Sequence, residues 1–514
     1  RDPTPSFKLY GKSDWSLVTD FFDSIDGKIV FPFWMKTYEL SRESKFGPQG
    51  GLPSWENLKD DFELYQTRLS EVQPESFTSG MYSGLNLSML GIDDALKSLK
   101  QQDKIETRAA GCPDFELKKT DTLAQIHAKQ AVRSGKMYDY FGYTFARFNK
   151  QKNRIFMPMP FSSMIAQAQY YDPFLRRIQE DLKAKGADSR FTFWSDKIGF
   201  EPCFSIATDL VNRVFSPKAK GILVFVQRDF EKMDTTTGTS QYINLFIPCL
   251  AEAFNFKKGS VPYKTMERVM LMTTQMPIAS PSGMMVGDHG TASGAEVTNG
   301  GETCCNHQYS TWAETELADR CRKAGIRYKL LVNFGNGDDG FNIYWLENPE
   351  DLDKFKEIRG KVYAEAMARF GFRGQPSKDL FSTEYGLYCQ NMVWYDENKV
   401  KYAYPASLIL NSIVNPEHQY TPAQWDKDYR DLDVIQKLDN GSGLPYFKEL
   451  VDYVDNGMKY HLLGRSEVET RRILSKWDKY RALQPLAERY NRQDYDITTS
   501  PTVLYILSKR GYSK

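Results

Sequence analysis

Two adjacent carboxylates, Asp338 and Asp339, stand between segments 328–334 and 341–346, which are rich in β-branched, aromatic and apolar residues. Such segments favour strands, and glycines between them allow the positive φ angles of a tight reversal. These glycines are Gly335, Gly337 and Gly340. Neighbouring carboxylates repel each other unless water or a cation faces them. The pattern predicts a hairpin whose acidic tip is either solvated or bound to a cation.

Another acid, Asp229, follows the apolar segment 222–226, which is typical of a strand buried on both faces. Asp234 would lie about 16 Å further along if the strand continued, at about 3.3 Å per residue. The chain must therefore curl after Asp229 if both acids serve one ligand. The alternative is a strand end with solvated acids.

The glycine-rich loop 287–303 precedes a predicted helix over 312–323. Glycines let another chain approach the backbone closely, and the absence of a following Gly-Lys-Ser/Thr excludes a phosphate-binding P-loop. The side chains able to bond a sugar are those of Ser293, Thr298 and Asn299. A flexible connector is the alternative, although Gly300 and Gly301 in or beside a helix would cost about 1 kcal/mol each relative to Ala.

Composition limits the classes of protein that fit. The 514 residues suggest about three compact units, and 41% hydrophobic residues supply a sizeable core. Lys plus Arg (67) nearly balance Asp plus Glu (66), so any nucleic-acid surface must be local. No apolar run approaches the ~18 residues that span a bilayer, and the chain starts at Arg1 without a leader. These features predict a soluble, intracellular protein without a membrane partner.

The seven cysteines form no Cys-x-x-Cys motif, which indicates a reducing compartment. One cluster could supply zinc ligands, but its adjacent cysteines do not follow the usual spacing, and buried thiols are ordinary core residues. Its members are His289, Cys304, Cys305, His307 and Cys321. The sequence favours core thiols over a zinc site.

The two ends of the chain differ in pattern. Residues 1–70 mix glycines, prolines and aromatics without sustained helical periodicity, which predicts an extended arm. After about residue 405 the pattern is helical. Segments 421–424 and 466–469 each combine a Ser or Thr with a Glu or Gln three residues later, which predicts two helix starts.

The acid after the first strand, the Ser-Gly loop and the acidic hairpin have a defined order and spacing in the sequence. Ser293 follows Asp229 by 64 residues and precedes Asp338 by 45. This order of strand-acid, Ser-Gly loop with helix, and Gly-Asp-Asp hairpin resembles motifs A, B and C of viral RNA-dependent RNA polymerases. Segments 228–234 and 293–299 are most similar to those of picobirnavirus polymerases. The resemblance extends over nearly the whole chain.

The resemblance implies an α+β fold shaped as a right hand, with an antiparallel palm sheet and an encircled form. The implied divisions are an arm (1–70), fingers (71–220 and 240–285), palm (221–239 and 286–396) and thumb (397–514). The implied activity is template-directed transfer of nucleotides from NTPs to an RNA 3′ end with Mg²⁺, for which Mn²⁺ can substitute. The enzyme would replicate and transcribe a viral double-stranded RNA genome as a monomer, in the host cytoplasm and the virion interior. A capsid-protein contact is left open.

Residue roles follow from the same resemblance. Asp229 and Asp338 are expected to bridge two Mg²⁺ ions about 3.5 to 4 Å apart, with Asp339 as a secondary ligand, because hard cations prefer carboxylate oxygens. Glu231 is a weaker candidate for the same site. Lys378 is the candidate general acid for the leaving pyrophosphate.

Substrate contacts are expected from three further segments. Lys152 and Arg154, assisted by Arg147, would hold the triphosphate. Asp234, with residues of the Ser-Gly loop, would bond the ribose 2′-hydroxyl. The loop residues with this expected role are Ser293, Thr298 and Asn299. A common family pattern has Asn where this chain has Glu302, so Asp234 is the stronger ribose candidate.

Two short segments complete the match. The residues expected to guide the template are Ala110, Gly111 and Pro113. Segment 385–392 resembles the motif E hairpin, for which an ordinary strand is the alternative. For the segment that carries Lys378, the alternative is a surface loop.

Other protein classes explain less of the pattern. A metal-dependent nuclease or phosphohydrolase would use the acids but gives no role to the Ser-Gly loop. A non-catalytic RNA-binding or capsid-associated protein would suit the basic, aromatic segment 138–150, since bases stack on aromatic rings. A reverse transcriptase is disfavoured because Gly337 precedes the Asp pair, where an aromatic residue is usual.

Overall fold

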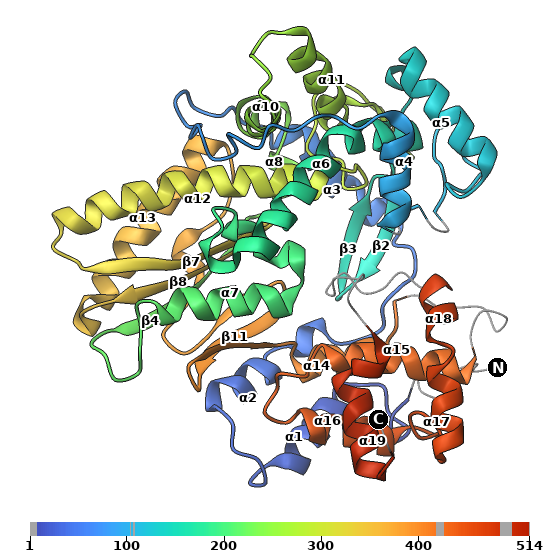
Figure 1. The fold of residues 1–514 in the computed structure, drawn as a ribbon, viewed down its shortest axis with the longest axis vertical. Coiled ribbons are helices and arrows are strands. Elements are labelled where there is room, and N and C mark those ends of the chain that lie inside the picture. The colour runs from blue at the N-terminus through green and yellow to red at the C-terminus, as the bar shows by residue number, and fades with distance from the viewer. Residues whose placement is uncertain (1–7, 103, 106–107, 418–425, 484–495, 513–514) are drawn as a thin grey trace.

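The computed structural model describes residues 8–102, 104–105, 108–417, 426–483 and 496–512, in an α+β arrangement as expected (Figure 1). The central sheet has the order β7 (Tyr328–Asn336), β8 (Asp339–Leu346), β4 (Ile222–Arg228) and β9 (Leu380–Ser382). All neighbouring strands in it are antiparallel, which confirms the predicted antiparallel sheet. β4 is central, and its apolar residues from Leu223 to Val226 are buried, as predicted for a strand covered on both faces.

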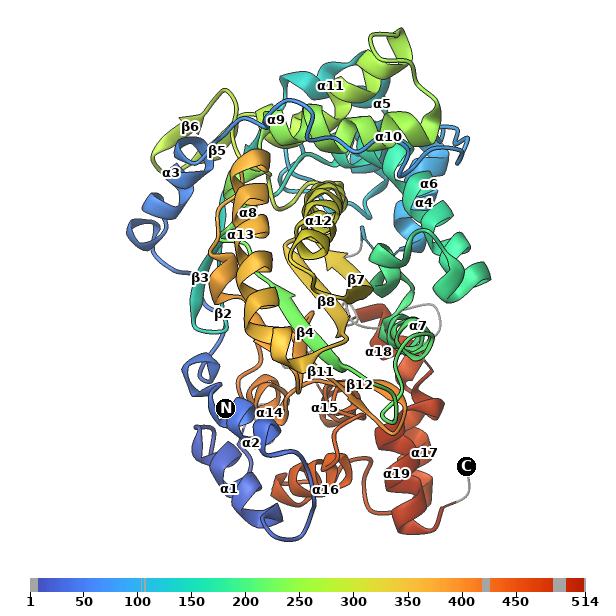
Figure 2. The same cartoon turned by 90° about the vertical axis from the view of Figure 1, so that its left-hand side faces the viewer.

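Helices cover both faces of this sheet (Figure 2). α12 (Thr298–Lys323) and α13 (Leu352–Phe370) pack against each other on one side, and α7 (Phe200–Asn212) lies on the other. These elements share one large hydrophobic core. The sheet is therefore held between helical layers, which fixes the end of β4 and the β7–β8 turn.

The part drawn above the sheet in Figure 1 is mainly helical, with small strands between the helices. Its helices are α3 (Lys59–Thr67), α4 (Ile92–Gln101), α5 (Thr122–Ser134), α6 (Phe161–Lys185), α8 (Met233–Thr236), α9 (Thr239–Gln241), α10 (Ile247–Phe254) and α11 (Val261–Gln275). Its strands are β1 (Gly142–Tyr143), β2 (Phe145–Asn149), β3 (Lys152–Phe156), β5 (Ile278–Ser280) and β6 (Gly283–Met285). β2 and β3 form a hairpin that descends from this part.

The C-terminal part is helical, as predicted, below a second antiparallel sheet of β10 (Gly386–Tyr388), β11 (Asn391–Asp396) and β12 (Lys399–Ala403). Its helices are α14 (Ala406–Val414), α15 (Lys427–Asp439), α16 (Phe447–Gly457), α17 (Glu467–Leu474), α18 (Trp477–Leu483) and α19 (Pro501–Arg510). The N-terminal helices α1 (Ser16–Ile25) and α2 (Phe33–Leu40) lie beside them in both views and share their hydrophobic core. The segment expected to be an extended arm is therefore partly helical, because this second core covers the apolar faces of α1 and α2.

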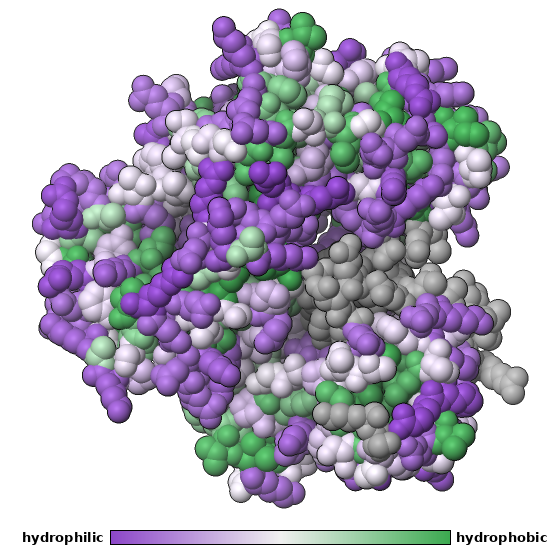
Figure 3. Space-filling view, in the orientation of Figure 1, coloured by the Kyte–Doolittle hydropathy of each residue, from purple (hydrophilic) through white to green (hydrophobic). Residues whose placement is uncertain are grey.

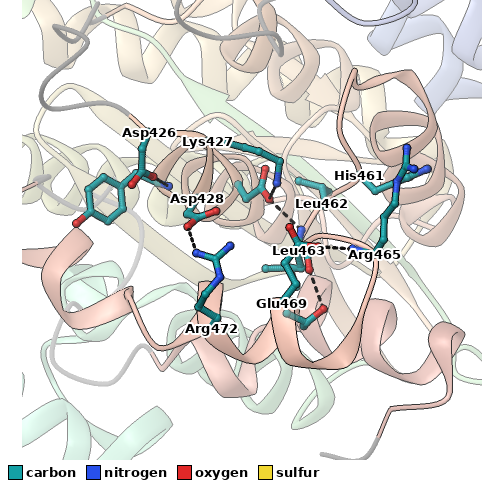
Figure 4. A network of polar contacts seen from close by, with 12 residues as sticks. Asp426, Lys427, Asp428, His461, Leu462, Leu463, Arg465, Glu469 and Arg472 are labelled. Carbon is teal, nitrogen blue, oxygen red and sulfur yellow. Dashed lines mark hydrogen bonds and ion pairs between the residues drawn. The ribbon is translucent and has the colours of Figure 1, made fainter.

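Polar contacts hold the C-terminal helices together (Figure 4). Ser466 caps α17 by accepting a hydrogen bond from the Glu469 amide at 3.2 Å, which confirms one predicted helix start. The Arg472 guanidinium pairs with Asp428 at 2.6 Å and joins α17 to α15. Asp431 accepts a hydrogen bond from the Leu463 amide at 3.0 Å. The other predicted helix start, 421–424, lies outside the described residues.

The β2–β3 hairpin contacts both the N-terminal segment and the start of the C-terminal part. The Gly50 amide donates to the Phe148 carbonyl at 3.0 Å, and Gln49 Nε2 donates to the Asn415 carbonyl at 2.9 Å. Arg147, in the middle of β2, pairs with Glu417 at 2.8 Å. The hairpin, the N-terminal segment and the C-terminal part therefore join at one point.

None of the helices in the described part of the chain is long and apolar enough to cross a membrane. The face drawn in Figure 3 is mostly polar, with scattered apolar patches.

Glu39 of α2 is fully buried and anchors the N-terminal segment to the C-terminal helices. Its carboxylate accepts hydrogen bonds from the first amides of α14, at 2.9 Å from Ala406 and 3.4 Å from Ser407, and from the Tyr446 hydroxyl at 3.3 Å. Burial raises the pKa of Glu39 to about 8, and these hydrogen bonds oppose the rise.

The raised pKa of Glu39 predicts a pH-dependent stability. In the unfolded chain this group loses its proton near pH 4.5, whereas in the folded protein it keeps the proton until about pH 8. The contribution of Glu39 to stability is therefore full below pH 4.5 and is lost as the pH rises toward 8. Thermal unfolding across this range should show a shallower decline for Glu39→Gln than for the parent, and equal slopes would contradict the assignment.

Candidate active site

The β7–β8 hairpin forms as predicted, with Gly337 and Asp338 as its two-residue turn between the paired residues Asn336 and Asp339. Gly337 has a φ of 58°. Gly335 and Gly340 do not take positive φ values, so the expected reason for these two glycines was wrong. A Cβ on Gly335 would lie 2.1 Å from the Phe193 ring, and one on Gly340 would lie 2.5 Å from Arg228 Nε. These glycines instead permit close packing around the turn.

Gly335→Ala should therefore destabilise the hairpin, since the new methyl group must displace the Phe193 ring. Overpacking of a tight core costs about 1–3 kcal/mol, and we expect a clear fall in Tm. Gly91→Ala is the matched control, because a Cβ there meets no atom of the described part of the chain within 4 Å. Equal Tm values for the two variants would show that the ring accommodates the methyl group.

The sheet brings Asp229 to the acidic turn. Arg228 pairs with Gly340, so Asp229 leaves β4 beside the first residues of β8. The chain then curls as predicted, with Lys232 in the left-handed region and α8 beginning at Met233.

The acids are close enough to interact electrostatically. Burial, followed by repulsion from Asp234 and Asp229, raises the pKa of Asp338 to about 6. Burial also raises the pKa of Asp339 to about 8, and Asp338, Asp196 and Asp229 reinforce the rise. Asp196, whose carboxylate accepts a hydrogen bond from the Tyr388 hydroxyl at 2.8 Å, was not found in the sequence because only the fold brings it near.

The donor set fits a hard divalent cation. Carboxylate oxygens are the ligands that Mg²⁺ prefers, and the mutual repulsion of these acids is relieved by positive charge. Within the described residues, no three His, Cys, Asp or Glu side chains are already arranged as a metal-binding group. The histidines considered as zinc ligands have other partners: His289 bonds the Gly290 and Met276 carbonyls at 2.7 Å, and His307 bonds the Tyr82 hydroxyl at 2.7 Å.

Buried cations lie beneath the acids. The Arg228 guanidinium donates to Asn333 at 2.8 Å, Asn342 at 2.7 Å and Asn306 at 3.1 Å. Arg359 pairs with Asp379 at 3.4 Å, and Asp379 accepts a hydrogen bond from the Asp229 amide at 3.3 Å.

Two side chains of α12 hold the acidic turn. Thr303 Oγ1 accepts a hydrogen bond from the Gly337 amide at 2.8 Å. Asn306 Nδ2 donates to the Gly337 carbonyl at 3.0 Å and to the Asp339 carbonyl at 2.9 Å. Their spacing of three residues, which places both on one helix face, is the signal that sequence reasoning missed.

α12 begins at Thr298, well before the predicted helix at 312, and contains both glycines of the loop. A Cβ on Gly300 would lie 2.2 Å from the Tyr171 ring, and one on Gly301 would lie 2.6 Å from the Tyr242 hydroxyl. Close packing against these rings explains why glycine is tolerated inside the helix.

Two of the residues expected to contact the sugar, Ser293 and Thr298, form hydrogen bonds within the protein that hold the Ser-Gly loop in place. Ser293 Oγ accepts a hydrogen bond from the Met157 amide at 3.0 Å, and Thr298 Oγ1 donates to the Ala292 carbonyl at 2.5 Å. Asn299 is exposed next to the hairpin, where its amide donates to Asn336 at 2.8 Å. Glu302 is buried, and its Oε1 has no hydrogen-bond partner among the described residues.

Two predicted cations face the acids from β3. Burial raises the pKa of Asp229, and the charge of Lys152 opposes this rise. Arg154 likewise opposes the raised pKa of Asp338. Lys45 of the N-terminal segment lies near both cations, since burial and the charges of Lys152, Arg42 and Arg154 lower the Lys45 pKa. Arg147 pairs instead with Glu417.

Other predicted residues lie further from the acids. Lys378 is exposed at the end of the short helix Pro376–Lys378, and no described ion pair joins it to them. Glu231 pairs with Arg68 at 2.6 Å. In the predicted template loop, Ala110 is tied by its amide to the Leu117 carbonyl and by its carbonyl to the Phe161 amide, both at 2.9 Å.

The other residues of the predicted template loop differ in their exposure to solvent. Gly111 is buried close to the Met159 carbonyl, whereas Pro113 is exposed. β10 and β11 pair as a hairpin that begins in the predicted segment 385–392 and extends beyond it, with Gly386 opposite Val393.

No protein-family model matches the chain, and no curated protein matches it in sequence. Solved structures do match. A crystal structure of the RNA-dependent RNA polymerase of a human picobirnavirus has a TM-score of 0.73 and 19% identity, covering 99% of this chain and 93% of that one. The insertion-loop deletion mutant of such a polymerase gives a TM-score of 0.72 at 19% identity, with the same coverage. Along nearly its whole length, the chain is similar in fold to these viral RNA polymerases.

Proposed function

We propose that this protein is a viral RNA-directed RNA polymerase, which transfers nucleotides from NTPs to an RNA 3′ end as a template directs. The observation that carries the proposal is the meeting of Asp229 with the Gly337-Asp338-Asp339 turn in an antiparallel sheet. The similarity to viral RNA polymerases over 99% of the chain supports it. A nuclease would also use clustered acids, but it gives no role to the Ser-Gly loop or to loop residues 109–113.

The proposal divides the molecule as a right hand. Residues 221–239 and 286–396 form the palm around the central sheet, and residues 71–220 and 240–285 form the fingers. Residues 397–514 form the thumb. The arm (1–70) connects the thumb to the fingers. The contacts of the β2–β3 hairpin with Gly50 and Glu417 support an encircled form.

Asp229 and Asp338 would hold two Mg²⁺ ions, or Mn²⁺ in their place, with Asp339 as a secondary ligand. The ions would lower the pKa of the attacking 3′-hydroxyl and neutralise the leaving pyrophosphate. The resting repulsion among the acids fits this role, because it disfavours the cluster until positive charge is present. The charges of Arg154, Lys150 and Lys152 oppose the raised pKa values of Asp338, Asp339 and Asp229, respectively.

The substrate contacts come from the surrounding segments. Lys152 and Arg154 would hold the triphosphate, and the effect of their charges on Asp229 and Asp338 supports this role. Asp234 would bond the ribose, with Asn299 at the rim. Lys378 would protonate the pyrophosphate after a movement of its exposed side chain. Loop residues 110–113 would guide the template strand.

The wider setting rests on the family resemblance. We infer that the protein acts as a monomer on a viral double-stranded RNA genome, in the host cytoplasm and the virion interior. Its partners would be the template, the nascent RNA and NTPs, with a capsid contact left open.

The direct test is incorporation of labelled ribonucleotides on a defined single-stranded RNA with Mg²⁺. Template-length product that requires all four NTPs would support the polymerase. RNA binding without synthesis, in the presence of a primer and of either metal, would favour a non-catalytic RNA-binding protein. RNA degradation would favour a nuclease.

Asp234→Ala should relax the preference for ribonucleotides, because a site built to bond a hydroxyl rejects the analogue that lacks it. We expect the ratio of kcat/KM for an NTP to that for the matching dNTP to fall about tenfold or more, as for loss of a hydrogen bond to a charged group. The ratio is measured by single-nucleotide incorporation. An unchanged ratio would remove Asp234 from the ribose site.

A further inference from the structure

Helix α3 of the N-terminal segment lies against the residues that follow Asp229. Two side chains of α3 contact this segment: the Tyr65 hydroxyl donates to Asp234 Oδ2, and Asp61 pairs with Lys232. Arg68, which directly follows α3, pairs with Glu231 at 2.6 Å. Tyr65 and Asp234 are 169 residues apart in sequence. A distant segment therefore determines how the turn after β4 is held.

The Tyr65–Asp234 pair is buried and fixed on several sides. Tyr65 is only 3% exposed. The Gly290 amide donates to the Tyr65 carbonyl at 2.7 Å, and the Thr291 amide donates to the Asp234 carbonyl at 2.8 Å. A Cβ on Gly290 would lie 2.3 Å from the Asp234 carbonyl oxygen and 3.0 Å from the Tyr65 ring. Only glycine lets the loop close over both residues.

The hydrogen bonds define the orientation of the Asp234 carboxylate. Tyr65 occupies Oδ2, and the Thr235 amide donates to Oδ1 at 3.0 Å. A carboxylate held at both oxygens cannot rotate freely, so its remaining lone pairs point in fixed directions. An acceptor held in a fixed direction bonds a substrate that has the hydroxyl donor. When the substrate lacks that hydroxyl, the acceptor is left without a partner, which costs free energy.

We propose that Tyr65 is a positioning residue for sugar selection: its hydroxyl orients the Asp234 carboxylate so that it accepts a hydrogen bond from the ribose 2′-hydroxyl. This inference rests on the proposed polymerase function and on the ribose role of Asp234. Tyr65 itself does not touch the substrate. The N-terminal segment thereby takes part in choosing ribonucleotides over deoxyribonucleotides.

Tyr65→Phe is the variant that tests the proposal, because it keeps the ring and removes a single oxygen. The measurement is kcat/KM for an NTP and for the matching dNTP in single-nucleotide incorporation with the full chain. We expect the NTP/dNTP ratio to fall roughly tenfold, the effect of losing one hydrogen bond to a charged group. The kcat for the NTP should change much less than this ratio.

Two matched controls separate orientation from packing. Tyr453→Phe removes another tyrosine hydroxyl, which donates to the Leu17 carbonyl at 3.0 Å far from the acids. Asp61→Asn weakens the docking of α3 while leaving the Tyr65 hydroxyl in place. Neither should change the NTP/dNTP ratio, and thermal unfolding of each variant reports its folding. A lowered ratio in Asp61→Asn equal to that in Tyr65→Phe would overturn the specific role of the hydroxyl.

A 2′-fluoro nucleotide provides an independent probe, since fluorine cannot donate a hydrogen bond. The parent should discriminate against it as against the dNTP, and Tyr65→Phe should discriminate less. An unchanged or increased NTP/dNTP ratio in Tyr65→Phe overturns the proposal. If Asp234→Ala lowers the ratio in the same assay, the ribose site stands and the Tyr65 role alone fails. If no variant makes RNA because the parent makes none, the polymerase function itself fails.

Discussion

Asp338→Asn is expected to abolish nucleotide incorporation while leaving template binding nearly intact. The substitution keeps the shape of the side chain but removes a charged oxygen from the proposed metal site. Metal ions supply several kcal/mol of charge stabilisation in such transfers, so the loss should be about a thousandfold or more. RNA binding depends on cations and aromatic residues elsewhere, and it should persist.

The same substitution should not lower stability. Repulsion from Asp234 and Asp229 acts on Asp338 in the folded protein, and a neutral amide removes that repulsion. We therefore expect a Tm equal to or above that of the parent, together with lost activity. Asp396→Asn, at the end of β11 and paired with Lys401 at 3.2 Å, is the control for a lost surface carboxylate. Substantial synthesis by Asp338→Asn would rule out the metal assignment.

Local patterns predicted the parts of the site that depend on neighbouring residues. The strand-forming residue types on each side of Gly337 predicted the hairpin, and the end of the apolar segment 222–226 predicted where Asp229 leaves the sheet. The 16 Å that would separate Asp229 from Asp234 in an extended strand predicted the curl after β4. These features follow from backbone geometry alone.

Features that depend on distant segments could not be predicted in this way. Helices α1 and α2 are short and form because the second core covers their apolar residues, whereas α3 packs in the core around the central sheet. The start of α12 was missed because Gly300 and Gly301 disfavour a helix until Tyr171 and Tyr242 pack against them. Tyr65 reaches Asp234 only through the three-dimensional fold, and no spacing in the sequence indicates the pair.

Asn306 offers the strongest test of how the helix after the Ser-Gly loop supports the acids. This buried amide donates to the carbonyls on both sides of Asp338, at 3.0 Å and 2.9 Å, and accepts a hydrogen bond from Arg228 at 3.1 Å. A cluster of like charges at a two-residue turn would tend to spread. The two donated bonds resist this movement because they fix the backbone on each side of the acid.

Asn306→Asp separates the hydrogen bonds of Asn306 from its packing, since Asp has nearly the same volume. The donors facing the Gly337 and Asp339 carbonyls become acceptors, while the partner for Arg228 is kept. We expect kcat to fall about 10- to 100-fold through loss of two hydrogen bonds and displacement of the turn, with KM for NTPs little changed.

Asn333→Asp is the matched control for Asn306→Asp, because Asn333 also accepts from Arg228, but its own amide donates to Ser310 rather than to the turn. It should lose far less activity. Equal losses in the two variants would mean that added charge near Arg228, and not the bonds to the turn, disturbs the acids. A large rise in KM with kcat preserved would instead place Asn306 in substrate binding, since a residue that only positions the acids acts on the chemical step.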